Sequence, residues 1–169
     1  PILSAGNWGG QGLHTRGNFE GYLRAGSREK WLEVHGHTHF THFYSTYGET
    51  LQKRFFAYTL KGDRQAWSDQ PPVSLNIRSP GEAFVLRGEK EWPLKRTRWT
   101  PFYLRSDLSL SPKAPSSRAP ISFDPAGDGL TFRSTAFDRD VEITGPLAAK
   151  IWLATESADA DLFVAFRVF

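Results

Sequence analysis

The hydrophobic positions of the first 62 residues follow two different spacings. Residues 1–5 and 30–34 are short apolar runs of the length expected for buried strands. Residues 18–25 and 49–61 carry apolar side chains three or four positions apart, which is typical of an amphipathic helix, and Asn18 is a candidate N-cap. The order strand, helix, strand, helix predicts two successive units of a parallel α/β sheet.

The pattern changes after Gly62. Residues 63–72 resemble a linker, and from residue 73 onward apolar and polar positions alternate with a period of two between Gly, Pro, Asp and Ser breakers. This spacing predicts β-strands without helices, in an all-β sandwich. The predicted strands are residues 73–79, 82–88, 100–106, 130–135, 140–145, 148–155 and 161–169. We therefore expect a domain division at 1–62, 63–72 and 73–169. Because both chain ends interrupt apolar segments, we also expect a fragment with an incomplete sandwich.

Composition and charge narrow the class of protein. The net charge of +3 arises from 21 basic and 18 acidic residues that are interspersed, which argues against a nucleic-acid partner. Cysteine is absent, so disulfides and cysteine–zinc sites are excluded. Within these 169 residues we find no signal-peptide pattern and no apolar run long enough to span a bilayer. We therefore expect no membrane association and a cytoplasmic location.

Four of the five histidines lie between Trp31 and Gly48, in the stretch "WLEVHGHTHFTHFYSTYG". One interpretation is a metal site, because His35, His37 and His39 are spaced two apart and would share one face of an extended strand. Three imidazoles on one face can hold zinc. Alternation places Glu33 on the same face as His35.

A second interpretation is acid–base catalysis by one of these histidines. A histidine on the loop between a late parallel strand and a helix is where an α/β-hydrolase carries its general base. Such a base takes the proton of a serine and later returns it to the leaving group. Loop histidines can also be hydrogen-bonded and inert, so position within the strand–loop–helix unit decides which one matters.

The residues resemble the late part of the α/β-hydrolase domain of the CocE/NonD family, relatives of the X-Pro dipeptidyl-peptidases. "LEVHGHTH" is similar to the family's strand and turn, and "RFFAYTLKG" to the end of the following helix. The second half resembles the family's C-terminal jelly-roll, which is galactose-binding-like. There "EWPL" and "DRDVEITGPLAAKIWLATESADADLFVAF" carry the resemblance.

The resemblance implies the last two strand–helix units of an α/β-hydrolase sheet followed by a β-sandwich jelly-roll. It assigns the catalytic histidine to His39. The family's acidic residue follows the preceding strand, where this chain has "AGNWGGQG", so Asn7 is the candidate for orienting the imidazole. Glu20 or a carboxylate upstream of the chain are the alternatives. The chain contains no G-x-S-x-G elbow, so we expect the serine nucleophile upstream of Pro1.

The function implied is that of a serine hydrolase, either an acyl esterase or amidase or an X-Pro dipeptidyl-peptidase. We expect no cofactor, a small ester, amide or short peptide as substrate, a homo-oligomer, and no activity from this chain alone. Two alternatives belong to other classes. One is the zinc site, and the other is a carbohydrate-binding sandwich that uses Trp67, Trp92, Trp99 and Trp152 for sugar stacking.

Overall fold

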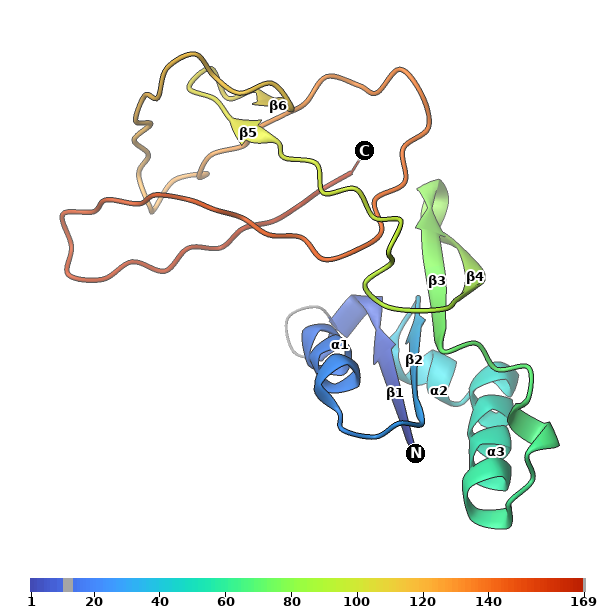
Figure 1. The fold of residues 1–169 in the computed structure, drawn as a ribbon. Coiled ribbons are helices and arrows are strands. Elements are labelled where there is room, and N and C mark those ends of the chain that lie inside the picture. The colour runs from blue at the N-terminus through green and yellow to red at the C-terminus, as the bar shows by residue number, and fades with distance from the viewer. Residues whose placement is uncertain (11–13, 169) are drawn as a thin grey trace. The chain divides into compact units, whose positions relative to one another are not determined.

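The computed structural model describes residues 1–10 and 14–168, with His39 described by its backbone alone. The chain forms two compact units (Figure 1). The first comprises Pro1–Lys95 and Gly145–Phe169, and the second comprises Arg96–Thr144. Among the described residues, no helix has the length and apolar character needed to cross a membrane.

A four-stranded sheet in the order β1-β2-β3-β4 organises the first unit. β1 (Ile2–Asn7), β2 (Lys30–His35) and β3 (Val73–Ser79) run parallel, and β4 (Ala83–Glu89) returns antiparallel to β3. The parallel pair predicted in the first 62 residues is confirmed. β3 and β4 were predicted as sandwich strands, but they extend this sheet, because a period-two pattern identifies a strand without identifying its neighbour.

Helices connect the parallel strands. α1 (Thr15–Arg24) follows β1, and α2 (His39–Phe43) and α3 (Thr46–Lys61) follow β2. Ser45 caps α3, because its side chain accepts a hydrogen bond of 3.2 Å from the Gly48 amide. Gly62 ends the helix in a left-handed conformation, with φ of 70°. Short 3-10 turns occur at Trp8–Gly10, Gln65–Trp67 and Pro80–Glu82.

Both predicted helices are present, but the expected start of the first one is wrong. α1 begins at Thr15, so Asn18 lies inside the helix instead of capping it. The Asn18 amide instead donates a hydrogen bond of 2.9 Å to the carbonyl oxygen of Ala5 in β1. An asparagine can serve either purpose, and the tertiary contact decides between them.

The two faces of β2 contact different helices. Leu32 and Val34 are fully buried with Val73 and Leu75 of β3, in a core that also contains Tyr22 of α1. On the opposite face, the Trp31 ring makes edge contacts with the α3 residues Phe55 and Tyr58, at 6.3 and 5.8 Å between ring centroids. Glu33 and His35 alternate with the core residues, so they face the side of α2 and α3.

The second unit contains one antiparallel pair, β5 (Tyr103–Leu104) with β6 (Leu110–Ser111). An isolated bridge joins Ser109 to Arg133. No α-helix occurs after residue 72 in the part of the chain that is described, as the sequence pattern predicted.

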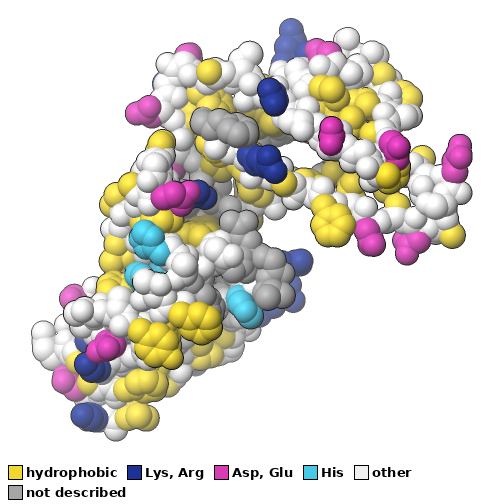
Figure 2. All heavy atoms as spheres, turned by 180° about the vertical axis from the view of Figure 1, so that it is seen from behind, with side chains coloured by type: hydrophobic (Ala, Val, Ile, Leu, Met, Phe, Trp, Pro, Cys, Tyr) yellow, Lys and Arg dark blue, Asp and Glu magenta, His cyan; other side chains and the backbone are white. Residues whose placement is uncertain are grey.

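The strands predicted at residues 130–135, 140–145, 148–155 and 161–169 are wrong as far as the described residues go, up to residue 168, because none of them forms a ladder there. A strand is held by hydrogen bonds to a neighbouring strand, and alternation alone does not provide that neighbour. Their hydrophobic side chains stay largely exposed, Trp152 at 74% and Phe163 at 94%. Figure 2 shows many such exposed side chains.

Candidate functional site

The histidine stretch begins at the carboxyl ends of two neighbouring parallel strands. Asn7 is the last residue of β1, His35 is the last residue of β2, and the two are paired in register. The turn at residues 36–38 then leads into α2. The edge formed by the carboxyl ends of parallel strands is where α/β proteins place their ligands.

Glu33 and His35 form a buried carboxylate–imidazole pair. The Glu33 Oε2 atom lies 2.9 Å from Nδ1 of His35, and the side chains are only 2% and 8% exposed. With the Glu33 carboxylate ionised, His35 Nδ1 donates this hydrogen bond, and Nε2 is the second ring nitrogen. Burial raises the pKa of Glu33, and the hydrogen bond and charge of His35 lower it in part.

His42 of α2 joins this pair from the other side of the turn. Its ring stacks on the His35 ring with 4.3 Å between centroids and 9° between planes. Its Nε2 atom lies 3.6 Å from Oε1 of Glu33. Burial, followed by the charges of His35 and His37, lowers the pKa of His42 to about 4. His42 is therefore neutral at physiological pH.

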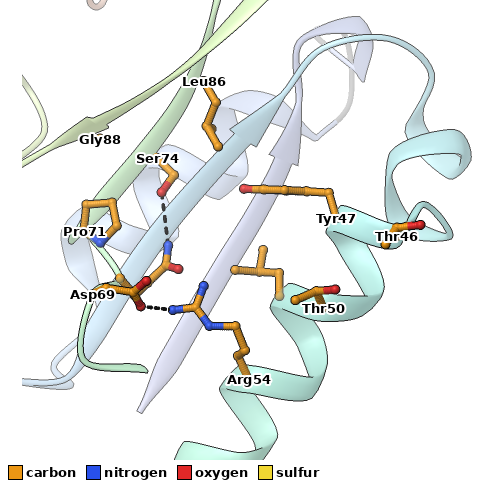
Figure 3. A pocket seen from close by; sticks show the side chains of 11 residues that line it. Thr46, Tyr47, Thr50, Arg54, Asp69, Pro71, Ser74, Leu86 and Gly88 are labelled. Atoms are coloured by element: carbon orange, nitrogen blue, oxygen red, sulfur yellow. Dashed lines mark hydrogen bonds and ion pairs between the residues drawn. The ribbon is translucent and has the colours of Figure 1, made fainter. Parts of the chain in front are cut away.

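Tyr47 connects the cluster to a cavity. Its ring lies 4.7 Å from the His42 ring, and burial, followed by the charge of Glu33, raises the pKa of Tyr47 well above its usual value. Figure 3 shows Tyr47 reaching from α3 into a pocket that faces β3 and β4. This pocket has a volume of about 430 Å³. An ion pair between Arg54 and Asp69 lies on its wall.

Asn7 holds the turn that carries the histidines. Its side chain is almost fully buried, and its amide nitrogen donates hydrogen bonds of 3.0 Å to the Gly36 carbonyl and 2.9 Å to the His37 carbonyl. His37 has a left-handed backbone with φ of 58°, an uncommon conformation for a residue other than glycine. The Asn7 clamp stabilises that conformation.

The structure places the three histidines proposed as zinc ligands in three different elements. The expected sharing of one strand face by His35, His37 and His39 is wrong, because β2 ends at His35 and the other two lie in a turn and in a helix. His37 is exposed, with its ring 4.9 Å from that of Phe84. His39 is the first residue of α2, and its side chain lies outside the described part of the structure.

The alternative orienting residue, Glu20, has another partner. It forms an ion pair of 2.7 Å with Arg24 on the exposed surface of α1. Sequence reasoning missed the role of His42, because its contact with Glu33 and His35 depends on how the turn folds back. The two-residue spacing of Glu33 and His35 did indicate that this pair shares a face.

We predict that Asn7→Asp destabilises the protein by about 3 kcal/mol or more at neutral pH. The aspartate loses both amide hydrogens and places a buried negative charge against two carbonyl oxygens. Asn18→Asp is the matched control, since the Asn18 amide also donates to a backbone carbonyl but at a half-buried position, less buried than that of Asn7. Urea unfolding measures both changes. An Asn7→Asp loss no larger than that of Asn18→Asp would contradict the buried clamp.

We predict that His42 makes folding less favourable as the pH decreases below 6.5. In that range the unfolded chain binds a proton at His42, whereas the folded chain, with the pKa of His42 at about 4, does not. Stability decreases with falling pH wherever the unfolded state binds more protons. Relative to His42→Gln, the wild type should lose about 1 kcal/mol per pH unit between pH 6 and 4. Urea unfolding at several pH values tests this, and a constant difference between the two proteins would rule it out.

Comparison with known proteins places the chain in a family. Residues 65–168 match the family described as the X-Pro dipeptidyl-peptidase C-terminal non-catalytic domain. Since the match covers more than half of the 169 residues, the chain belongs to this family. The residues of the candidate site, from Asn7 to Tyr47, lie before the matched range.

Relatives of this chain are CocE/NonD proteins. Cocaine esterase of Rhodococcus sp. (strain MB1 Bresler) is 28% identical over 151 residues, covering 66% of this chain and 26% of that protein. A crystal structure of a CocE/NonD family hydrolase from Staphylococcus aureus is 36% identical, with a TM-score of 0.65. This similarity covers 69% of the present chain and 21% of the Staphylococcus aureus chain. The chain is therefore a C-terminal portion of a CocE/NonD-type protein and spans about a quarter of its relatives' length.

Proposed function

We propose that this chain is part of a serine hydrolase of the acyl-esterase, amidase or X-Pro dipeptidyl-peptidase type. In this proposal it supplies His39 as the catalytic histidine, while the serine nucleophile lies upstream of Pro1. The observation that carries the proposal is the histidine turn at the carboxyl end of β2, clamped by Asn7 of β1. The hydrolases among the relatives support the same reaction class.

The proposed chemistry assigns one proton transfer to this chain. His39 takes the hydroxyl proton when the serine attacks an ester or amide carbonyl, and later returns it to the leaving group. Asn7 is the proposed orienting residue, by analogy with sites that use an asparagine in place of an aspartate. Its amide hydrogens are occupied by the turn, so its oxygen is the atom that can accept from an imidazole N–H.

The remaining assignments belong to the same proposal. Residues 1–62 are proposed as the end of an α/β-hydrolase domain, 63–72 as a linker, and 73–169 as part of a galactose-binding-like jelly-roll. The family match from residue 65 supports a boundary in this region, whereas the pairing of β3 with β2 ties the two parts together. Small esters, amides or short peptides are the proposed substrates, in a cytoplasmic homo-oligomer without a cofactor.

The carbohydrate-binding alternative loses two of its four tryptophans, while Trp99 and Trp152 stay 66% and 74% exposed. Of the four tryptophans considered for sugar stacking, Trp67 and Trp92 are only 4% and 8% exposed. Trp67 makes an edge contact with Trp31, and Trp92 belongs to the core cluster. A ring that is already covered on both faces cannot stack on a sugar, so these two residues have structural roles.

Turnover of simple substrates tests the proposal. The full-length protein should hydrolyse a p-nitrophenyl ester or an X-Pro p-nitroanilide, with a burst if an acyl-enzyme accumulates. The 169-residue chain alone should show no turnover, because it has neither the nucleophile nor an oxyanion hole. Burst kinetics from the chain alone would contradict an upstream serine. A full-length protein inactive on every ester, amide and X-Pro substrate would contradict the hydrolase assignment itself.

A further inference from the structure

The cluster of Glu33, His35 and His42 contains more buried polar atoms than its own contacts satisfy. Three of them have no hydrogen-bond partner among the described residues, one from each side chain: Glu33 Oε1, His35 Nε2 and His42 Nε2. Burying a polar atom without a partner costs free energy. Three such atoms within one cluster therefore call for an explanation.

A metal ion is the first candidate for the missing partner. The three residues can each offer a ligand atom, and these atoms lie within 4.8 Å of one another. An imidazole, however, binds a metal in the plane of its ring. The rings of His35 and His42 are stacked 4.3 Å apart and only 9° from parallel, so one ion cannot lie in both planes. This ring geometry does not form a three-ligand metal site.

The same geometry suits a hydrogen-bonded cluster. Glu33 is fixed in β2, and its Oε2 accepts from His35 Nδ1. Its second oxygen lies 3.6 Å from His42 Nε2, so a displacement of a few tenths of an ångström gives the carboxylate a second imidazole donor. The stacked rings hold the two histidines together across the turn.

The cluster fixes the helix that begins with His39. α2 has only five residues, and a helix of that length is not stable without tertiary contacts. His42 lies three residues after His39 in this helix and is its connection to the buried pair on β2. The Ser45 hydroxyl also donates a hydrogen bond of 2.7 Å to the His42 carbonyl, which joins the end of α2 to the cap of α3.

We propose that Glu33, His35 and His42 are positioning residues for catalysis, which hold α2, and with it His39, at the carboxyl end of β2. This inference rests on the proposed function of His39. The buried carboxylate also supplies, close to the turn, a negative charge that the neutral Asn7 does not have. Such a charge stabilises the imidazolium that forms when the base takes its proton.

The test uses the full-length protein and the variants Glu33→Gln and His42→Ala, with the exposed His37→Ala as the matched control. Both cluster variants should lower kcat on the order of 10²-fold, since a small misplacement of a catalytic group has an effect of this size. KM should change little, because these residues do not contact the substrate. In Glu33→Gln, the acid limb of the kcat–pH profile should also move to lower pH, since losing a negative charge lowers the pKa of the base.

Further measurements distinguish a failure of the positioning role from a failure of the proposed function. Nitrogen NMR of the wild type should show His35 protonated at Nδ1, and Glu33→Gln should alter this signal. If Glu33→Gln does not fold, His42→Ala carries the same kinetic expectation. If both variants keep the wild-type kcat and pH profile while His39→Ala is inactive, the positioning role is overturned and the proposed function stays intact. Stoichiometric zinc that is lost in Glu33→Gln would overturn it in favour of a metal site. An inactive wild type would overturn both proposals.

Discussion

Replacing His39 by alanine in the full-length protein is expected to lower kcat/KM by a factor on the order of 10³ or more. The imidazole is the proposed carrier of the serine proton. The members of such a unit act together, so most of the rate enhancement disappears with one of them. Steady-state hydrolysis of a p-nitrophenyl ester measures the change, and circular dichroism checks that the fold is retained.

His37→Ala is the matched control for this substitution. His37 lies two residues away on the same turn, and its side chain is exposed against Phe84. We expect it to change kcat/KM by less than about tenfold, because its removal leaves the buried cluster intact. Equal losses in the two variants would show that the turn as a whole matters, and not the imidazole of His39.

Gly48→Ala is expected to destabilise the protein by about 3 kcal/mol. A Cβ atom at this position would collide with the carbonyl oxygen of His42 and with the backbone of Phe43. Both groups belong to the end of α2, so neither can move without displacing the helix that carries the histidines. The substitution should therefore lower the activity of the full-length protein as well as its free energy of unfolding.

Gly21→Ala in α1 is the corresponding control. Nothing lies within 4 Å of the added Cβ there, and the residue is an exposed position of a regular helix. The same chemical change should therefore stabilise the protein by about 0.5–1 kcal/mol, because alanine restricts the unfolded chain more than glycine does. If Gly48→Ala is as harmless as Gly21→Ala, then α3 does not pack closely against the end of α2.

The sequence predicted the N-terminal sheet because local patterns determine it. Residues 30–34 form a strand from their own apolar run, and residues 49–61 form a helix from their own spacing. Both observed elements extend these predictions by only a few residues. The shared face of Glu33 and His35 was equally accessible, since alternation in an extended strand requires it.

Contacts between distant residues could not be predicted in the same way. The hydrogen bonds of Asn7 to Gly36 and His37 span 29 and 30 positions, and they depend on the register of β1 with β2. The stacking of His42 on His35 requires the chain to reverse through the left-handed conformation of His37. The strand predictions from residue 130 onward were incorrect over the described residues, because their patterns contain no information about a pairing partner.

Labelling of the reactive serine can show both where this residue lies and whether its reactivity depends on His39. The full-length protein would be treated with a fluorophosphonate probe, and the labelled residue identified by peptide mass spectrometry. We predict one labelled serine outside residues 1–169, with labelling abolished in His39→Ala and retained in His37→Ala. A labelled serine within residues 1–169, or labelling that proceeds unchanged in His39→Ala, would contradict this prediction.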